Sequence, residues 1–200
     1  MGLLTTSLSK MNFLQKTSYG FDCGSIYSEI IKKITNPLTH FIPECISNDN
    51  RFYSGQDSSG KASTFDEQIK KLNLENKKIF IKMDIEGAEF DALTDIIKKP
   101  ENIAGILVKI HFLTKRKYSI KTAKLLEKLQ EHFYLVHMHT NNCTSRILET
   151  MHLSSPISDV IELSHINKNL VSKAQLIKEI SYPTKMDSPN HPDFKYKIIH

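Results

Sequence analysis

Residues 79–93 read IFIKMDIEGAEFDAL, an apolar strand that runs into two carboxylates, a glycine and an amphipathic helix. In an open α/β sheet, ligands bind at the carboxyl ends of the strands. Asp84 and Glu86 therefore stand where a site is expected. Gly87 allows a sharp turn, and Glu89 falls in the first helical turn, where the helix dipole favours a negative charge.

Strands alternate with helices on both sides of this stretch. Strands are expected over residues 16–23, 38–42, 78–85, 104–112, 134–139 and 159–165. Helices are expected over residues 26–34, 64–72, 87–98 and 118–132. A capping box formed by Thr64 and Glu67 opens the second helix, and spacing places Ala123, Leu126 and Leu129 on the inner face of the last one. The alternation predicts an α/β fold, with a mainly parallel sheet and helices on both faces. The closing strands need not be parallel.

Length and charge limit the classes of partner. A chain of 200 residues suits one domain, with residues 1–15 as an extension and residues 181–200 as a surface tail. The net charge is +5, and the basic residues are spread over expected helices, which indicates solvated helix faces rather than a nucleic-acid groove. No apolar run reaches the ~18 residues of a membrane span, so stable membrane insertion is not expected.

The three cysteines, Cys23, Cys45 and Cys143, are far apart and form no CxxC pair. This spacing favours neither a disulfide framework nor a zinc site. The expected compartment is therefore a reducing one, and the expected location is the cytoplasm.

Several motifs carry a family resemblance. Residues 82–89, KMDIEGAE, resemble the K-x-D-I-E-G-x-E signature of FkbM-type methyltransferases. Residues 108–112, VKIHF, are similar to a later strand of that family, which usually reads E-x-H. Residues 135–143, LVHMHTNNC, look like the H-x-H-x-N-N-C stretch of one branch, and residues 160–163 and 182–190 look like its ending. The resemblance covers roughly residues 60 to 195.

The resemblance implies a Rossmann-like fold and S-adenosyl-L-methionine as the cofactor. It also implies O-methylation of a hydroxyl on a sugar or another small, glycan-like acceptor. In this chain Asp84, Glu86 and His111 match the motifs and would assist removal of the hydroxyl proton. Lys109 departs from the family's usual glutamate, and a lysine cannot replace a glutamate that holds a metal or a substrate.

The candidate cofactor residues follow the first two expected strands. Gly20, Asp22 and Gly24 would form a loop that lets the backbone approach S-adenosylmethionine, although an ordinary strand-to-helix turn has the same composition. Glu44 stands where an acid can bind ribose hydroxyls, although a solvated loop glutamate explains it as well. Asp84 is the last of the candidate cofactor residues. Carboxylates such as Asp84 and Glu86 favour a cationic sulfonium, although both could instead cap the helix.

A histidine cluster forms the second part of the predicted site. His137 and His139 lie on one face of their strand because side chains alternate. If His111 ends a neighbouring strand, all three approach Asp84 and Glu86, with Asn141 and Asn142 as further substrate contacts. The histidines could bind a divalent metal, or one could be a general base. No close-spaced ligand motif is present, so the base reading is favoured and no metal is predicted.

Two other functions remain open from the residues. The first is a non-catalytic Rossmann-like binding protein derived from a methyltransferase, which the sparse glycine loop and Lys109 favour. The second is a metal-dependent hydrolase built on the Asp, Glu and His cluster, which no HExxH-type motif supports.

Overall fold

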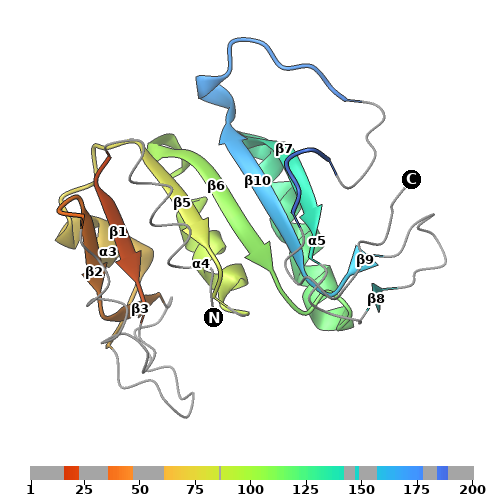
Figure 1. The fold of residues 1–200 in the computed structure, drawn as a ribbon, viewed down its shortest axis with the longest axis horizontal. Helices are drawn as coiled ribbons and strands as arrows, with labels where there is room; N and C mark the ends of the chain where they lie inside the picture. Colours follow the sequence, from red (N-terminus) through yellow and green to blue (C-terminus); the bar gives the residue numbers. More distant parts are fainter. Residues whose placement is uncertain are drawn as a thin grey trace. The chain divides into compact units, whose positions relative to one another are not determined.

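The computed structural model describes residues 16–22, 36–46, 61–85, 87–141, 147–148, 157–177 and 184–188 (Figure 1). The chain divides into two compact units, Met1–Gln68 and Ile69–His200, and each is described here by itself. The helix expected over residues 26–34 lies outside the described residues.

The first unit contains two pairs of parallel strands. Strand β1 (Ser18–Phe21) pairs with β2 (Thr39–Ile42), as expected, and the Ser18 and Thr39 hydroxyls lie 3.1 Å apart across the pair. Strands β3 (Glu44–Ile46) and β4 (Lys61–Ser63) form the second pair, which the sequence did not predict because each strand has only three residues.

Helix α3 (Phe65–Lys71) follows β4, and its capping box is confirmed. The Thr64 hydroxyl accepts a hydrogen bond from the Glu67 N–H at 3.2 Å. In return, Oε2 of Glu67 accepts one from the Thr64 N–H at 2.8 Å. Two backbone donors that have no partner within the helix are thereby satisfied, which fixes where the helix begins.

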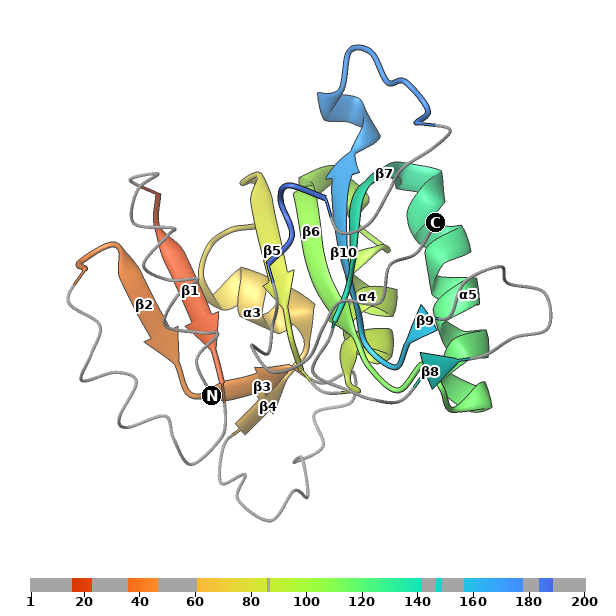
Figure 2. The ribbon, with the colours of Figure 1, turned by 45° about the vertical axis from the view of Figure 1, so that its right-hand side comes forward.

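The second unit is built on a four-stranded sheet in the order β5-β6-β10-β7 (Figures 1 and 2). Strands β5 (Ile79–Met83) and β6 (Ile103–Ile110) are parallel. Strand β10 (Ile161–Asn167) lies between β6 and β7 (Phe133–Thr140) and runs antiparallel to both. The fold is therefore mixed α/β. The sheet is thus mixed rather than mainly parallel as expected, because β5–β6 is the one parallel pair among its described strands and the closing strand β10 reverses direction.

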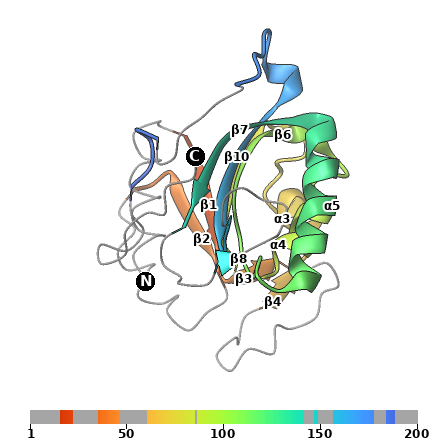
Figure 3. The same cartoon turned by 90° about the vertical axis from the view of Figure 1, so that its right-hand side faces the viewer.

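Helices α4 (Glu89–Ile96) and α5 (Arg116–His132) contact each other and lie on the same side of this sheet (Figure 3). Between them and the sheet lies a dry core, in which Ile96, Leu129 and Val108 have no exposed surface. Burial of apolar surface of this kind is the main stabilising term.

The other face of the sheet carries both polar and apolar side chains, with Phe80 of β5 and Leu107 of β6 among the apolar ones. Lys109 on β6 and Glu162 on β10 are register partners, and their neighbours along each strand point to the helices instead. Helices α4 and α5 both lie on the opposite side of the sheet (Figure 3). The expectation of helices on both faces is therefore wrong for the described part of the second unit, where residues 184–188 lie on this face.

Short elements complete the second unit. The 3₁₀ helix η2 (Pro100–Asn102) precedes β6, and η3 (Lys168–Leu170) follows β10. The Asn167 side chain donates to the carbonyls of Pro100 and Ile103, both at 2.8 Å, and so ties the two segments together. Strands β8 (Ile147–Leu148) and β9 (Ile157–Ser158) form a two-stranded antiparallel pair. No described helix combines the length and the apolarity needed to cross a bilayer.

Candidate functional site

Polar side chains collect at one edge of the four-stranded sheet. Asp84 follows β5, His111 follows β6, and Asn141 follows β7. Strand β10 is antiparallel to its neighbours, so Glu162, near its start, lies at the same edge. This is the edge formed by the carboxyl ends of the parallel strands, where ligands bind in open α/β sheets.

His111 is held between two carboxylates. Its Nδ1 lies 2.6 Å from Oε1 of Glu89, a side chain with no exposed surface. The other oxygen of Glu89 accepts the Gly87 N–H at 2.7 Å. On the opposite side of the ring, Nε2 of His111 lies 3.5 Å from Oδ1 of Asp84. The convergence of Asp84 and His111, expected from the sequence, is therefore present.

The buried Glu89 carboxylate determines which ring nitrogen of His111 carries the proton. A carboxylate can only accept, so Nδ1 of a neutral His111 carries the proton that it donates to Glu89. Its Nε2 then carries the lone pair and lies on the Asp84 side of the ring, where the His111 side chain is 11% exposed and the Asp84 side chain 29%. An imidazole in this state can accept a proton from a nearby hydroxyl. Sequence reasoning gave Glu89 a role only at the helix dipole and missed this contact.

Lys109 brings a positive charge to the same site. Its Nζ lies 3.3 Å from Oδ2 of Asp84, with about a fifth of the lysine side chain exposed. Glu162 is its register partner on β10, and Asn141 donates to Oε1 of Glu162 at 3.1 Å. Since register partners share one face of a sheet, charges of alternating sign cross this edge from β5 to β7.

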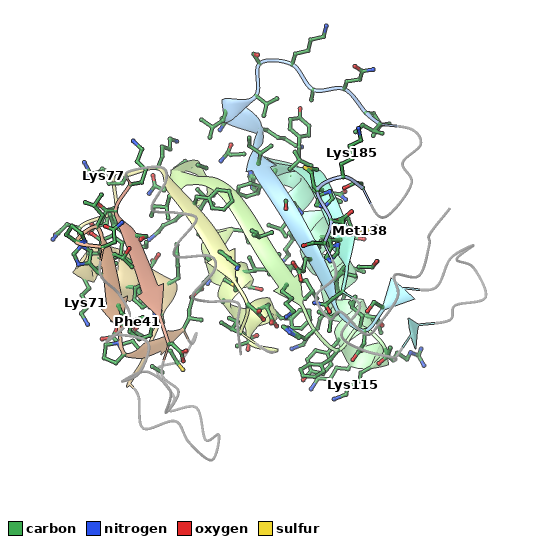
Figure 4. The ribbon with its side chains drawn as sticks, viewed as in Figure 1. Phe41, Lys71, Lys77, Lys115, Met138 and Lys185 are labelled. Carbon is green, nitrogen blue, oxygen red and sulfur yellow. The ribbon has the colours of Figure 1, made fainter. Side chains whose placement is uncertain are left out.

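His137 and His139 both contact one carboxylate. Nε2 of His137 and Nδ1 of His139 lie 2.9 and 2.7 Å from Oδ1 of Asp187. The Asp187 side chain is 1% exposed and belongs to residues 184–188, called the C-terminal segment below. Figure 4 labels Lys185 of this segment and Met138 of β7. The structure thus joins the two histidines to the C-terminal segment, and their role as substrate contacts stays a prediction.

Opposing effects act on the Asp187 carboxyl. Burial raises its pKa, but hydrogen bonds from Thr184 and His137 and the charge of His139 lower it, and the net result is below the ordinary value. The acid is therefore held as an anion, which suits an acceptor shared by two imidazoles. Sequence reasoning assigned no role to Asp187, because its partners lie 48 and 50 residues away along the chain.

The predicted cofactor residues of the first unit have different surroundings. Gly20 lies within β1 rather than in a loop, and a Cβ there would lie 3.3 Å from the Phe41 ring. The structure therefore does not place Gly20 in the cofactor loop that the sequence predicted. The Asp22 N–H donates to the Ile42 carbonyl at 3.3 Å just beyond the strand. Gly24, Glu86 and Asn142 lie outside the described residues.

Glu44 is not a solvated loop glutamate. It begins β3, is 6% exposed, and its Oε2 accepts from the Ser63 hydroxyl at 2.9 Å. The Gln68 amide donates to the same hydroxyl at 3.2 Å. Burial of a carboxylate is costly unless it is hydrogen-bonded, which these contacts provide.

Cys45, next to Glu44, forms a disulfide bond, contrary to the expectation of reduced cysteines. Cys23 and Cys143 lie outside the described residues. Among the side chains that the structure describes, no three from His, Cys, Asp or Glu are grouped as metal ligands.

Comparisons of the chain with protein-family models, with curated proteins and with solved structures gave no match. The methyltransferase resemblance therefore rests on the sequence motifs alone.

Proposed function

We propose that this chain is an S-adenosyl-L-methionine-dependent methyltransferase of Rossmann-like fold. Its acceptor would be a hydroxyl on a sugar or another small, glycan-like molecule. The observation that carries the proposal is the Glu89–His111–Asp84 arrangement at the carboxyl ends of two adjacent parallel strands. The motif in residues 82–89 supplies the reaction class. The order β5-β6-β10-β7, with one reversed strand, is compatible with such a fold.

The residues support proton removal from an attacking hydroxyl. When bound, S-adenosylmethionine supplies the methyl group and leaves as the neutral thioether S-adenosylhomocysteine. Nε2 of His111 takes the proton that the acceptor hydroxyl loses as its oxygen bonds to the methyl carbon. Glu89 stabilises the imidazolium that forms, and Asp84 orients the hydroxyl. Holding the reacting groups in line contributes most of the rate.

Asp84 is the described residue of the second unit best suited to the cofactor. Its side chain is 29% exposed, so it remains accessible, and its charge favours a sulfonium cation. The cofactor roles of Gly20, Asp22 and Glu44, in the first unit, stay predictions from the sequence. The positive charge of Lys109, whose Nζ lies 3.3 Å from Oδ2 of Asp84, opposes the binding of a cationic cofactor beside Asp84.

The same lysine favours a second candidate function. A non-catalytic binding protein descended from a methyltransferase would tolerate a neutralised Asp84, and the 3.3 Å contact between Lys109 and Asp84 provides that neutralisation. Binding of S-adenosylhomocysteine without methyl transfer to any hydroxyl would favour this candidate.

The location proposed from the cysteine pattern is the cytoplasm. The disulfide at Cys45 weighs against it, because disulfides persist mainly in oxidising compartments. Counting free thiols in protein taken from its native source, together with cell fractionation, distinguishes a cytoplasmic location from an oxidising compartment. Three free thiols in a cytosolic fraction support the proposal.

A methyl-transfer assay tests the proposed function. The full chain is incubated with methyl-labelled S-adenosylmethionine and a panel of mono- and oligosaccharides, and label in the product is counted. Label in an acceptor, lost in a His111→Gln variant that folds normally, supports the proposal. Equal label in the wild type and the variant would remove His111 from the reaction.

A further inference from the structure

Phe112, the residue after His111, has an unusual backbone. Its φ is +64°, in the left-handed region that bulky side chains rarely adopt. A backbone of this kind costs free energy and persists only where its surroundings enforce it. A glycine or asparagine would adopt the same turn more easily, so the phenylalanine ring itself is the feature to explain.

The ring of Phe112 lies against Gly87 in the loop between β5 and α4. A Cβ on Gly87 would lie 3.0 Å from Cε2 of Phe112, and Gly87 itself has a φ of +114°. On its other sides the ring is 5.4 Å from the Tyr118 ring, and Nζ of Lys115 lies 4.4 Å from its centroid. The ring thus contacts the loop before α4 and Tyr118 of α5, beside Lys115, which Figure 4 shows at the start of α5.

These contacts close a cycle around the proposed base. Phe112 is bonded to His111 through the chain and contacts Gly87 through its ring. The Gly87 N–H donates to Oε2 of Glu89, and Oε1 of Glu89 lies 2.6 Å from Nδ1 of His111. Two of these links, Phe112 to Gly87 and Glu89 to His111, join the segment after β5 to the segment after β6. The position of Glu89 relative to His111 therefore depends on where the Phe112 ring holds Gly87.

We propose that Phe112 is a positioning residue, whose ring holds the loop of Glu89 against the end of β6 so that Nε2 of His111 faces Asp84. The assignment of catalysis to His111 rests on the proposed function. The effect on the hydrogen bond between His111 and Glu89 does not, because that bond exists in the protein without substrate.

The test compares Phe112→Gly, Phe112→Leu and Phe112→Tyr in the full chain. Phe112→Gly removes the ring and relieves the backbone strain, whereas Phe112→Leu removes the ring and keeps a side chain at the positive φ, so an effect common to both belongs to the ring. Phe112→Leu keeps apolar volume and serves if the glycine variant fails to fold. Phe112→Tyr keeps the ring over Gly87 and is the matched conservative control.

The first readout is the Nδ1–H proton of His111 in NMR spectra of the ligand-free protein. A hydrogen bond to a buried carboxylate moves this signal far downfield of the other side-chain protons. We expect the signal in the wild type and in Phe112→Tyr, and its loss in Phe112→Gly and Phe112→Leu. Retention of the signal in both of those variants would show that Phe112 serves packing alone and would overturn the proposal.

The second readout is the split between kcat and KM for methyl transfer. Misplacement of the base lowers kcat by about 10²-fold and leaves KM for S-adenosylmethionine unchanged. If the wild type transfers no methyl group, the proposed function fails, while the NMR readout still decides the role of Phe112. A fall in kcat without loss of the N–H signal would contradict the positioning role.

Discussion

Nδ1 of His111 lies 2.6 Å from Oε1 of Glu89, and the glutamate side chain has no exposed surface. A carboxylate is buried without large cost only when its oxygens have partners. Glu89 has two, the imidazole and the Gly87 N–H. Glu89, the residue that begins helix α4, thus also fixes the tautomer of His111, the residue that follows β6.

Replacing Glu89 by glutamine tests the chemical consequence of this contact. Glu89→Gln keeps the shape but removes the charge that stabilises the imidazolium, so methyl transfer should fall by about 10²-fold or more. Asp91→Asn is the matched control, because Asp91 is an exposed acid in the same helical turn. Turnover and circular dichroism are measured for both. Equal turnover in the two variants would remove Glu89 from the mechanism.

The ion pair between Asp84 and Lys109 allows a paired comparison. Asp84→Asn and Lys109→Met both break the 3.3 Å contact, and since both side chains are partly exposed each change should cost only about 0–1 kcal/mol of stability. Asp84→Asn should lower methyl transfer by about 10²-fold, because the acceptor hydroxyl loses its orienting group. Lys109→Met should retain more activity than Asp84→Asn. The opposite order would place the orienting role on the lysine.

From the burial of His165 we predict that the folded protein loses stability in mild acid. His165 is 3% exposed, its Nδ1 has no hydrogen-bond partner among the described residues, and burial lowers its pKa from 6.5 to about 4. Between these values the unfolded chain binds the proton and the folded chain does not, so stability falls as pH falls through this window. The full effect is on the order of 3 kcal/mol.

Urea unfolding at pH 7.5 and pH 5 measures this loss, with His165→Leu as the variant that cannot titrate. We expect the wild type to lose more stability between the two pH values than His165→Leu does. Equal losses would assign the acid sensitivity to other groups.

Asp187 is predicted to hold the C-terminal segment on β7. Its lowered pKa means that the anion stabilises the fold at neutral pH, and that this stabilisation is lost as pH falls through the lowered value. Asp187→Asn should remove the ionic part of both histidine contacts. We expect faster hydrogen exchange in residues 184–188 of the variant. Met186→Ala, at a side chain 73% exposed in the same segment, should exchange like the wild type.

Local signals in the sequence predicted local structure well. The Thr64–Glu67 capping box and strands β5 and β6 are where the pattern places them, because caps and short apolar strands depend on neighbours in the chain. The prediction of which side chains of a helix face the core was less accurate. Ala123, expected on the inner face of α5, is exposed, whereas Thr122 is buried and satisfies its hydroxyl on the Tyr118 carbonyl at 2.9 Å.

The site was predicted only in part, for a physical reason. That Asp84 and His111 meet follows from the geometry of adjacent parallel strands, which a pattern can reveal. The burial of Glu89 and the binding of His137 and His139 to Asp187 depend on contacts 22 to 50 residues apart in the chain. The antiparallel pairing of β10 with β6 and β7 was not predicted either, because the alternation of apolar residues does not determine which strands pair.

Calorimetric titration of the full chain with S-adenosylhomocysteine, paired with a thermal shift measurement, determines whether the protein binds the product cofactor of methyl transfer. A ligand that binds only the folded state stabilises it by about 2.7 kcal/mol at a hundredfold excess over its Kd. If the protein is a methyltransferase, we expect saturable heat, a raised melting temperature, and weaker binding in Asp84→Asn. Absence of both heat and thermal shift at millimolar ligand, with a folded wild-type protein, would contradict the proposed function.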